Sequence, residues 1–327
     1  MNACTLATVV VAAALAAAGC DDAAAPVACD RACLVSLADA YVAALAARDP
    51  KRVPLADNIA FVENVKRLAP GEGLWASAVS AHPTYRIYVP DPDTGSIGIM
   101  TRVDRETARG VEPAQLAVRL KVEAGRITEA EHLVAAIESD ETRARLTVPR
   151  PNLTAPVDET ARMPRAALAA IAASYYDSLD ESDGNLAPFA DDCQRLENGN
   201  VTAGPGLAPE PFASVDVDGR PPPPVARDCI GQMSSRRFAY IDTIDNRRIF
   251  AVDPVQGLAM GLSHFRQSMA RGPQLMIAAD GSQVMWAEKR DAYDLPAAHI
   301  FKITGGQIHE VEALGIFIPY NSPTGWE

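Results

Sequence analysis

Apolar and polar positions form two series along this chain, and the two series have the same order. Residues 34–48 and 166–179 carry apolar side chains at the three- to four-residue spacing of a helix that packs on one face. Segments that alternate with a period of two follow each predicted helix, which predicts half-buried strands. These segments are residues 85–89, 96–103, 114–122 and 126–135, and then residues 247–252, 258–266, 297–303 and 307–318. The pattern predicts an α+β protein in which a helix layer precedes a curved antiparallel sheet, twice.

The two series also match residue by residue, as an internal repeat. Residues 37–64 align with residues 171–198 without a gap. The blocks 86–95 and 125–131 then match 248–257 and 306–312 in the same order. Because the order is kept while the offset grows through two insertions, we interpret the chain as a duplication.

This repeat predicts the domain organisation. We expect a signal peptide (1–20), a tether (21–28), a first unit (29–138), a linker (139–163) and a second unit (164–327). The last two predicted strands of each unit form a hairpin, with tight turns at 123–125 and 304–306. The second unit carries insertions at 203–225 and 268–295. The first of these is proline-rich and extended, and the second forms an extra hairpin or covers a pocket mouth.

Several short motifs carry a resemblance to a known fold. They are Cys-Asp-Arg-Ala-Cys at 29–33, Phe-Val-Glu-Asn at 61–64, Gly-Leu-Trp at 73–75, Cys-Gln-Arg-Leu-Glu-Asn at 193–198 and Asp-Cys at 228–229. With the layout of helix and sheet, the chain resembles the nuclear-transport-factor-2-like, or SnoaL-like, cone fold, and more narrowly a group of tandem secreted proteins of fungi and bacteria. The resemblance implies a bent sheet around a pocket, and two units packed sheet to sheet as an intramolecular pseudo-dimer. It implies no single activity, because this fold hosts dehydratases, isomerases, cyclases, lyases and binding modules.

The first 20 residues have the features of an export signal. Residues 8–18 are small, apolar and uncharged, and too short to span a bilayer. They end in Leu-Ala-Ala-Ala-Gly before Cys20, which resembles a bacterial lipobox. We therefore expect lipidation of Cys20 and anchoring in the bacterial envelope, on its periplasmic or extracellular face, with ordinary secretion as the alternative.

The remaining cysteines fit an oxidising compartment. Cys29, Cys33, Cys193 and Cys229 allow three pairings. Cys29/Cys33 could close at a helix start and Cys193/Cys229 could pin the ends of the first insertion. A zinc site is the alternative, but a second close pair of cysteines is missing.

Charge narrows the range of ligands. The chain has 327 residues and a net charge of −12, which argues against nucleic acid because a phosphate-binding surface needs clustered Lys and Arg. The sequence contains no phosphate loop, nucleophile elbow, HExxH motif or dinucleotide fingerprint. We expect no cofactor and no metal, and a small-molecule ligand instead. A metal site from His264, His299 and Glu288 or Asp291 is possible by composition, but their spacing does not require it.

The recurring Glu-Asn pairs are the leading catalytic candidates. A Glu in an apolar cone could transfer protons, and the alternative is a structural role at a strand end. We expect the working pocket to hold Glu197, Asn198, His309 and Tyr175 in the second unit, or the set Glu63, Asn64, His132 and Tyr41 in the first. His309 is expected to point inward because Val311 and Ala313 alternate with it, and the alternative is a core or rim histidine.

Four further residues are candidates for substrate binding. Arg86 and Arg248 could hold an anion, or pair with the nearby Asp91 and Asp253. Trp75 and Trp286 could stack on a sugar or aromatic ring, or pack in a core. The sequence thus favours a tethered, cofactor-independent lyase, dehydratase or isomerase acting on a small organic molecule or sugar, with a non-catalytic ligand- or partner-binding module as the alternative.

Overall fold

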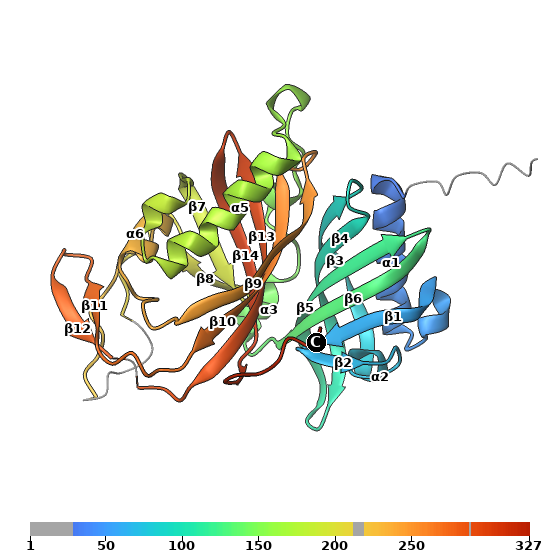
Figure 1. Ribbon diagram of the computed structural model, residues 1–327, viewed down its shortest axis with the longest axis horizontal. Helices are drawn as coiled ribbons and strands as arrows, with labels where there is room; N and C mark the ends of the chain where they lie inside the picture. The colour runs from blue at the N-terminus through green and yellow to red at the C-terminus, as the bar shows by residue number, and fades with distance from the viewer. Residues whose placement is uncertain (1–28, 212–218, 288) are drawn as a thin grey trace, which may run out of the picture.

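The computed structural model describes residues 29–211, 219–287 and 289–327. The expected signal peptide, Cys20 and the tether lie outside these residues, as does part of the first insertion. The α+β prediction is confirmed, and two units of the same design lie side by side (Figure 1). We call them unit 1, from α1 to β6, and unit 2, from α5 to β15, and keep 29–138 and 164–327 as their proposed bounds.

Unit 1 is a helix followed by a six-stranded sheet. Its elements are α1 (Arg31–Ala46), a 3-10 turn (Pro50–Arg52), β1 (Leu55–Glu63), β2 (Lys66–Leu68), α2 (Leu74–Ser77), β3 (Ala78–Asp91), β4 (Ser96–Thr107), β5 (Gly110–Glu123) and β6 (Arg126–Ala136). The linker contains α3 (Asp140–Arg145), α4 (Pro151–Thr154) and a 3-10 turn (Glu159–Ala161).

Unit 2 repeats this order and adds two insertions. Its elements are α5 (Arg165–Asp180), a 3-10 turn (Gly184–Leu186), β7 (Phe189–Glu197), β8 (Asn200–Ala203), α6 (Cys229–Ser234), β9 (Thr243–Asp253), β10 (Leu258–Gln267), β11 (Gln274–Ile277), β12 (Gln283–Trp286), β13 (Tyr293–Thr304), β14 (Gln307–Gly315) and β15 (Ile318–Pro319). The second insertion contains the hairpin β11–β12, which projects from the sheet (Figure 1).

The two sheets have the same strand order. It is β2-β1-β6-β5-β4-β3 in unit 1 and β8-β7-β14-β13-β10-β9 in unit 2. Neighbouring strands run antiparallel except β1 with β6 and β7 with β14, which run parallel. The hairpin turns expected from the sequence are present, and Ala124-Gly125 and Gly305-Gly306 all have positive φ. This conformation is the one that a two-residue hairpin turn requires.

The first helix begins three residues earlier than the apolar spacing indicates, because its first turn is capped and cross-linked. The carboxylate of Asp30 accepts a hydrogen bond from the Cys33 amide at 2.8 Å, and Cys29 is disulfide-bonded to Cys33. A capping side chain satisfies an amide that has no partner inside the helix. A second disulfide joins Cys193 on β7 to Cys229 at the start of α6, across the first insertion.

The sheets turn one face toward their own helix and the other toward the opposite unit. A buried apolar cluster of residues from both units fills the space between the sheets, and it includes Ile87, Met100, Leu133, Met260, Ile300 and Leu314. Two ion pairs flank this cluster. Arg31 of α1 contacts Asp253 at 2.8 Å, and its repeat equivalent Arg165 of α5 contacts Asp91 at 2.7 Å. The two units therefore exchange equivalent salt bridges.

Candidate functional site

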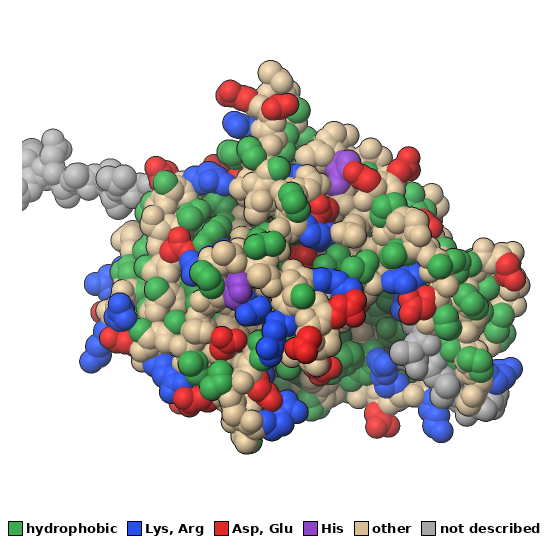
Figure 2. Space-filling model, turned by 180° about the vertical axis from the view of Figure 1, so that it is seen from behind, with side chains coloured by type: hydrophobic (Ala, Val, Ile, Leu, Met, Phe, Trp, Pro, Cys, Tyr) green, Lys and Arg blue, Asp and Glu red, His purple; other side chains and the backbone are tan. Residues whose placement is uncertain are grey.

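The interior of unit 2 contains a cavity of about 370 Å³. Small-molecule sites commonly have volumes of roughly 300–1,000 Å³. Its apolar wall comes from Leu179, Phe238, Ile241, Phe265, Leu295, Ala297, Ala313, Leu314 and Phe317. Its polar lining comes from Arg195, Glu197, Asn198, Asn200, Thr202, Arg237, Tyr240, Gln267, Arg290, Tyr293 and His299. A hollow with hydrophobic side chains in its depth and charged side chains at its edge is visible in the half of the molecule formed by unit 2 (Figure 2).

Strand alternation brings the polar groups into this interior. Successive side chains of a strand point to opposite faces, so alternate residues line one side. On β7 these are Arg195 and Glu197, on β10 Phe265 and Gln267, and on β13 Leu295, Ala297 and His299. The cavity is therefore lined by the sheet of unit 2 and by the segment that follows α6.

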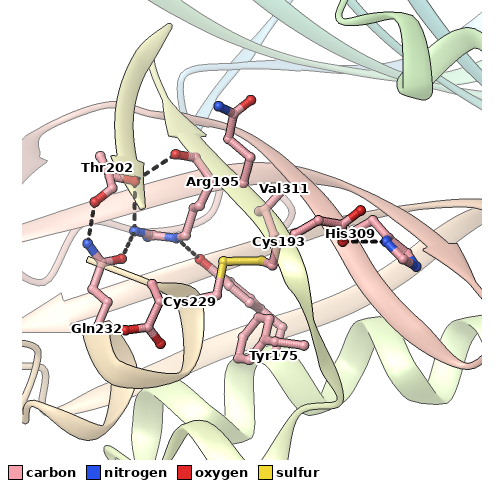
Figure 3. Close-up of a disulfide and its surroundings, with 12 residues drawn as sticks. Tyr175, Cys193, Arg195, Thr202, Cys229, Gln232, His309 and Val311 are labelled. Atoms are coloured by element: carbon pink, nitrogen blue, oxygen red, sulfur yellow. Dashed lines mark hydrogen bonds and ion pairs between the residues drawn. A yellow bond between two sulfur atoms is a disulfide. The ribbon is translucent and has the colours of Figure 1, made fainter. Parts of the chain in front are cut away.

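Arg195 is the most tightly held of these residues. Its Nε donates to the Tyr175 hydroxyl at 2.7 Å, and its Nη1 donates to Gln232 Oε1 at 2.9 Å and to Thr202 Oγ1 at 3.1 Å. Its Nη2 forms an ion pair with Glu197. Figure 3 shows the guanidinium among Tyr175, Thr202 and Gln232, beside the Cys193–Cys229 disulfide. The disulfide attaches α6 to β7, so it also holds Gln232 against Arg195.

The charge of Arg195 is fixed although the residue is only 2% exposed. Burial acts to lower the pKa of Arg195, but Glu197 and Tyr175 outweigh burial and raise that pKa. Arg237, which also lines the cavity, has its pKa lowered to about 10 by burial. Both guanidinium groups are therefore cations at neutral pH.

His299 lies in the same interior and is neutral. Burial, together with the nearby charge of Arg195, lowers its pKa to about 3. Its Nδ1 lies 3.2 Å from the Tyr176 hydroxyl, whose pKa burial raises. In the described residues, Nε2 has no hydrogen-bond partner. If Tyr176 donates to Nδ1, Nε2 carries the proton and can donate to a ligand.

Gln267 is a second polar group without a protein partner. It is 2% exposed, it lines the cavity, and its Oε1 makes no hydrogen bond in the part of the chain that the structure describes. A buried amide without a partner is costly. A ligand that hydrogen-bonds Gln267 would remove this cost.

Unit 1 has a different interior at the equivalent place. Tyr41 lies 2.9 Å from His132 Nε2, and His132 Nδ1 lies 3.1 Å from Glu63 Oε2. Glu63 also accepts the amide of Leu74, at the start of α2. Trp75 packs edge-on against Tyr41, and His132 is fully buried. Three of the four residues expected for a pocket in unit 1 thus form one hydrogen-bonded chain, but large side chains fill the surrounding space.

The repeat alignment explains this difference. Phe61, His132 and Val118 of unit 1 correspond to Arg195, Ala313 and His299 of unit 2. The exchange of His132 for Ala313 leaves space next to Glu197, and the exchange of Phe61 for Arg195 puts a charge there. Arg195, Arg237 and Gln267 were absent from the candidate residues chosen from the sequence, and His299 was considered only as a metal ligand. An aligned inward position that is apolar in one unit and polar or charged in the other is the signal that could have identified Arg195 and His299.

The inward orientation expected for His309 is wrong. His309 Nδ1 lies 2.6 Å from Asp192 Oδ1, on the side away from Arg195 (Figure 3). The register of β13 with β14 shifts between Ile303↔Ile308 and Lys302↔Glu310, so His309 is an unpaired bulge residue. A bulge breaks the alternation on which the expectation rested.

The two asparagines each hold a neighbouring strand through hydrogen bonds at a strand end. Asn64 accepts the Val134 amide at 2.8 Å, and Asn198 accepts the Gly315 amide at 2.9 Å. Both have positive φ, at 46° and 47°, a conformation that asparagine tolerates. Asn198 in addition lines the cavity.

None of the four residues expected to bind substrate lines the cavity of unit 2. Arg86 pairs with Asp39, and Arg248 makes two hydrogen bonds to Glu131 of unit 1, at 2.8 and 2.9 Å. The expected pairing of these arginines with Asp91 and Asp253 is therefore wrong. Trp75 is a core residue of unit 1, and Trp286 packs with Val225 and Met276 in a small separate cluster.

The described residues among those considered for a metal site do not come together. His264 lies 3.1 Å from Asp294, on the opposite face of the sheet from His299. Glu288 lies outside the described residues. Among residues 29–211, 219–287 and 289–327, no group of three His, Cys, Asp or Glu side chains is arranged to hold a metal ion.

Comparisons with known proteins give a family and distant structural similarity. A family model described as "Domain of unknown function (DUF8021)" matches residues 28–134 and 161–315. No curated protein matches. Among solved structures, AusH from Aspergillus nidulans is 12% identical with a TM-score of 0.29, covering 34% of this chain and 89% of that chain.

Two further solved structures have a similar degree of likeness. A putative polyketide cyclase from Silicibacter sp. TM1040 is 15% identical with a TM-score of 0.29, covering 48% of this chain and 92% of that chain. A hypothetical protein with a ketosteroid isomerase-like fold from Catenulispora acidiphila is 14% identical with a TM-score of 0.25, covering 35% of this chain and 93% of that chain. Likeness at this level transfers no activity to the chain.

Proposed function

Since the chain belongs to the DUF8021 family, a domain of unknown function, we propose from its geometry that unit 2 binds a small organic anion with an apolar or aromatic body. The observation that carries this proposal is the cavity of about 370 Å³ that combines an apolar wall with buried cationic groups. Unit 1, whose equivalent interior is filled by Phe61, Trp75 and His132, acts as a scaffold.

The charges of the cavity favour an anion. Its described lining contains three guanidinium groups, from Arg195, Arg237 and Arg290, and one carboxylate, from Glu197. Arg195 donates its hydrogen bonds to protein groups, so it contributes a fixed positive charge rather than direct contacts. Such a charge needs no reorganisation when the ligand arrives, and it acts strongly in a partly water-excluded space.

His299 supplies the direct contact in this proposal, and Arg237 adds positive charge at the same place. A neutral imidazole with Nε2 protonated donates one hydrogen bond to a carboxylate oxygen. Phe238 and Phe265 provide the apolar wall against which a ring packs.

The test is calorimetric titration of 4-hydroxybenzoate and of its neutral methyl ester. We expect the acid to bind at least ten times more tightly than the ester. Arg237→Gln should remove most of this difference, whereas Arg109→Gln, on the exposed surface of unit 1, should leave it unchanged. Equal affinities for acid and ester, or no binding of either, would contradict the proposal.

A second candidate is a cofactor-independent isomerase or lyase reaction in the same cavity. It is favoured by one observation, which is that His299 and Glu197 both line the cavity. In this mechanism Glu197 removes a proton next to a carbonyl group, His299 Nε2–H stabilises the oxyanion, and the proton returns to a different carbon atom.

Deuterium exchange distinguishes the two candidates. Phenylpyruvate carries a carboxylate, an aromatic ring and an enolisable carbon. In D₂O, an enzyme would accelerate exchange at that carbon and Glu197→Gln would abolish the acceleration. A binding module would bind phenylpyruvate without changing the exchange rate.

We also propose that the chain is exported and held at a membrane through a lipid on Cys20. No helix in the described residues combines the length and apolar character needed to cross a membrane. The two disulfides are compatible with an extracellular location. Mass spectrometry of the mature N-terminus tests the proposal, because a diacylglyceryl-modified Cys20 supports it and an unmodified N-terminus at another residue contradicts it.

A further inference from the structure

We propose that the ligand extends out of the cavity of unit 2 into a groove between the two units, and that the part in this groove is neutral and hydroxylated, as in a glycoside of an aromatic acid. This inference rests on the proposed binding of an organic anion in the cavity. The inter-unit groove has a volume of about 450 Å³ and is lined by Ala136, Glu138 and Thr142 on one side and by Asn200 and Ile316 on the other.

The groove and the cavity adjoin each other. Asn198, Asn200, Gly315 and Phe317 line both. Asn198 holds Gly315 through two hydrogen bonds, at 2.9 and 3.0 Å, which fixes the boundary between the two spaces. Asn200 and Phe317 are exposed at this boundary. A ligand that enters the cavity past Phe317 therefore lies next to the groove.

The charge of the groove differs from that of the cavity. Glu138 is the one charged side chain in the described lining of the groove, whereas the described lining of the cavity contains three arginines and one glutamate. An anionic group would be repelled by Glu138 and attracted by the cavity. An elongated ligand is thereby oriented with its acid in the cavity and its neutral end in the groove.

Hydroxyl and amide groups give the groove its chemistry. Thr142 donates to Asn200 Oδ1 at 3.1 Å, and the Nδ2 of Asn200 has no partner among the described residues. Phe317 is 65% exposed and packs against Tyr293, with the two rings tilted by 57° and their centroids 5.1 Å apart. An exposed aromatic ring beside amide donors suits a sugar, which has an apolar ring face and many hydroxyl groups.

The experiment compares 4-hydroxybenzoate with its 4-O-β-D-glucopyranoside, which carries the same acid and adds one neutral sugar. Calorimetric titration of the full protein should show that the glucoside binds about ten times more tightly. Ala136→Trp places bulk at an exposed position of the groove and should cancel this gain while leaving the affinity for 4-hydroxybenzoate unchanged. Val111→Trp is the matched control, because Val111 is 59% exposed and lines a neighbouring hollow instead.

The outcomes separate this inference from the function on which it rests. If 4-hydroxybenzoate binds and the glucoside binds no more tightly, the extension into the groove is wrong and the anion site stands. If the glucoside still binds more tightly than 4-hydroxybenzoate in the Ala136→Trp variant, the proposed extension of the ligand into the groove is also wrong. If neither compound binds, both the extension and the proposed function are contradicted.

Discussion

The hydroxyl of Tyr175 accepts a hydrogen bond from Arg195 Nε at 2.7 Å inside unit 2. The equivalent hydroxyl in unit 1, that of Tyr41, pairs with His132 instead, because Phe61 stands where unit 2 has Arg195. The same tyrosine of the duplicated helix thus supports a filled core in one unit and a charged cavity in the other.

We therefore expect that replacing Arg195 strongly lowers the free energy of unfolding. Arg195→Met would leave buried acceptors on Tyr175 and Gln232 without a donor, and would remove the ion-pair partner of Glu197. We expect a loss of about 3–5 kcal/mol in the free energy of unfolding, measured by urea denaturation. Tyr175→Phe removes a single hydrogen bond and should cost about 1–2 kcal/mol. Equal, small losses for both variants would show that the network does not hold the core.

Stability should depend on pH through His299. Its pKa is about 3 in the folded protein because of burial, against about 6.5 when unfolded. As pH falls below 6.5, His299 takes up a proton in the unfolded chain but not in the folded protein. The contribution of His299 to the free energy of unfolding is therefore fully present above that pH and is lost progressively below it. Between pH 7 and 5 the expected loss is about 2 kcal/mol.

His299→Gln is the matched variant for this measurement. It lacks the titrating group, so its free energy of unfolding should fall by about 2 kcal/mol less than that of the wild type over the same pH range. Parallel pH profiles for the two proteins would mean that His299 is accessible to protons in the folded state.

The Cys193–Cys229 disulfide should matter for binding as well as for stability. It closes a sequence separation of 36 residues, for which the chain-entropy model gives about 4 kcal/mol. Because it attaches α6 to β7, replacing both cysteines by serine should also weaken ligand binding, through Gln232 and the segment that contains Arg237.

Replacing Cys29 and Cys33 by serine provides the control. This pair is separated by four residues, so the same model gives about 2 kcal/mol, and the pair lies in unit 1. Ligand affinity should stay unchanged. If both double variants weakened binding equally, the disulfide in unit 2 would have no particular connection to the cavity.

The paired salt bridges between units predict matched losses of stability. Arg31→Ala and Arg165→Ala each leave a buried carboxylate, on Asp253 or Asp91, without its cation. We expect each to cost about 1–3 kcal/mol. Arg109→Ala, which removes an exposed ion pair with Glu112, should cost less than about 1 kcal/mol. A negligible effect of both interface variants would argue against our proposal that the two units stabilise each other as an intramolecular pseudo-dimer.

Periodicity and the repeat predicted the fold well, because both depend on local spacing. The helix layer, the strands after it and the hairpin turns at 124–125 and 305–306 were all readable from the sequence. The prediction failed at His309 because a bulge in β14 leaves this residue unpaired and shifts the register of the strand. The alternation of apolar residues in the sequence does not reveal a bulge.

The candidate site was harder to predict, because it depends on which inward positions are empty. Tyr41, Glu63 and His132 were chosen for their chemistry and do meet, but the space around them is filled. Arg195 and His299 are separated by about a hundred residues and come together only through the strand order β7-β14-β13. Neither volume nor sheet register is encoded in a short motif.

In our proposal, the space beside Ala313 makes unit 2 a binding site. Ala313→Phe fills this space, and Ala313→Ser keeps it open. Titration of 4-hydroxybenzoate should show wild-type affinity for Ala313→Ser and at least a tenfold loss for Ala313→Phe, with both variants melting within a few degrees of the wild type. Unchanged affinity in a folded Ala313→Phe variant would contradict our proposal that unit 2 binds its ligand in this space.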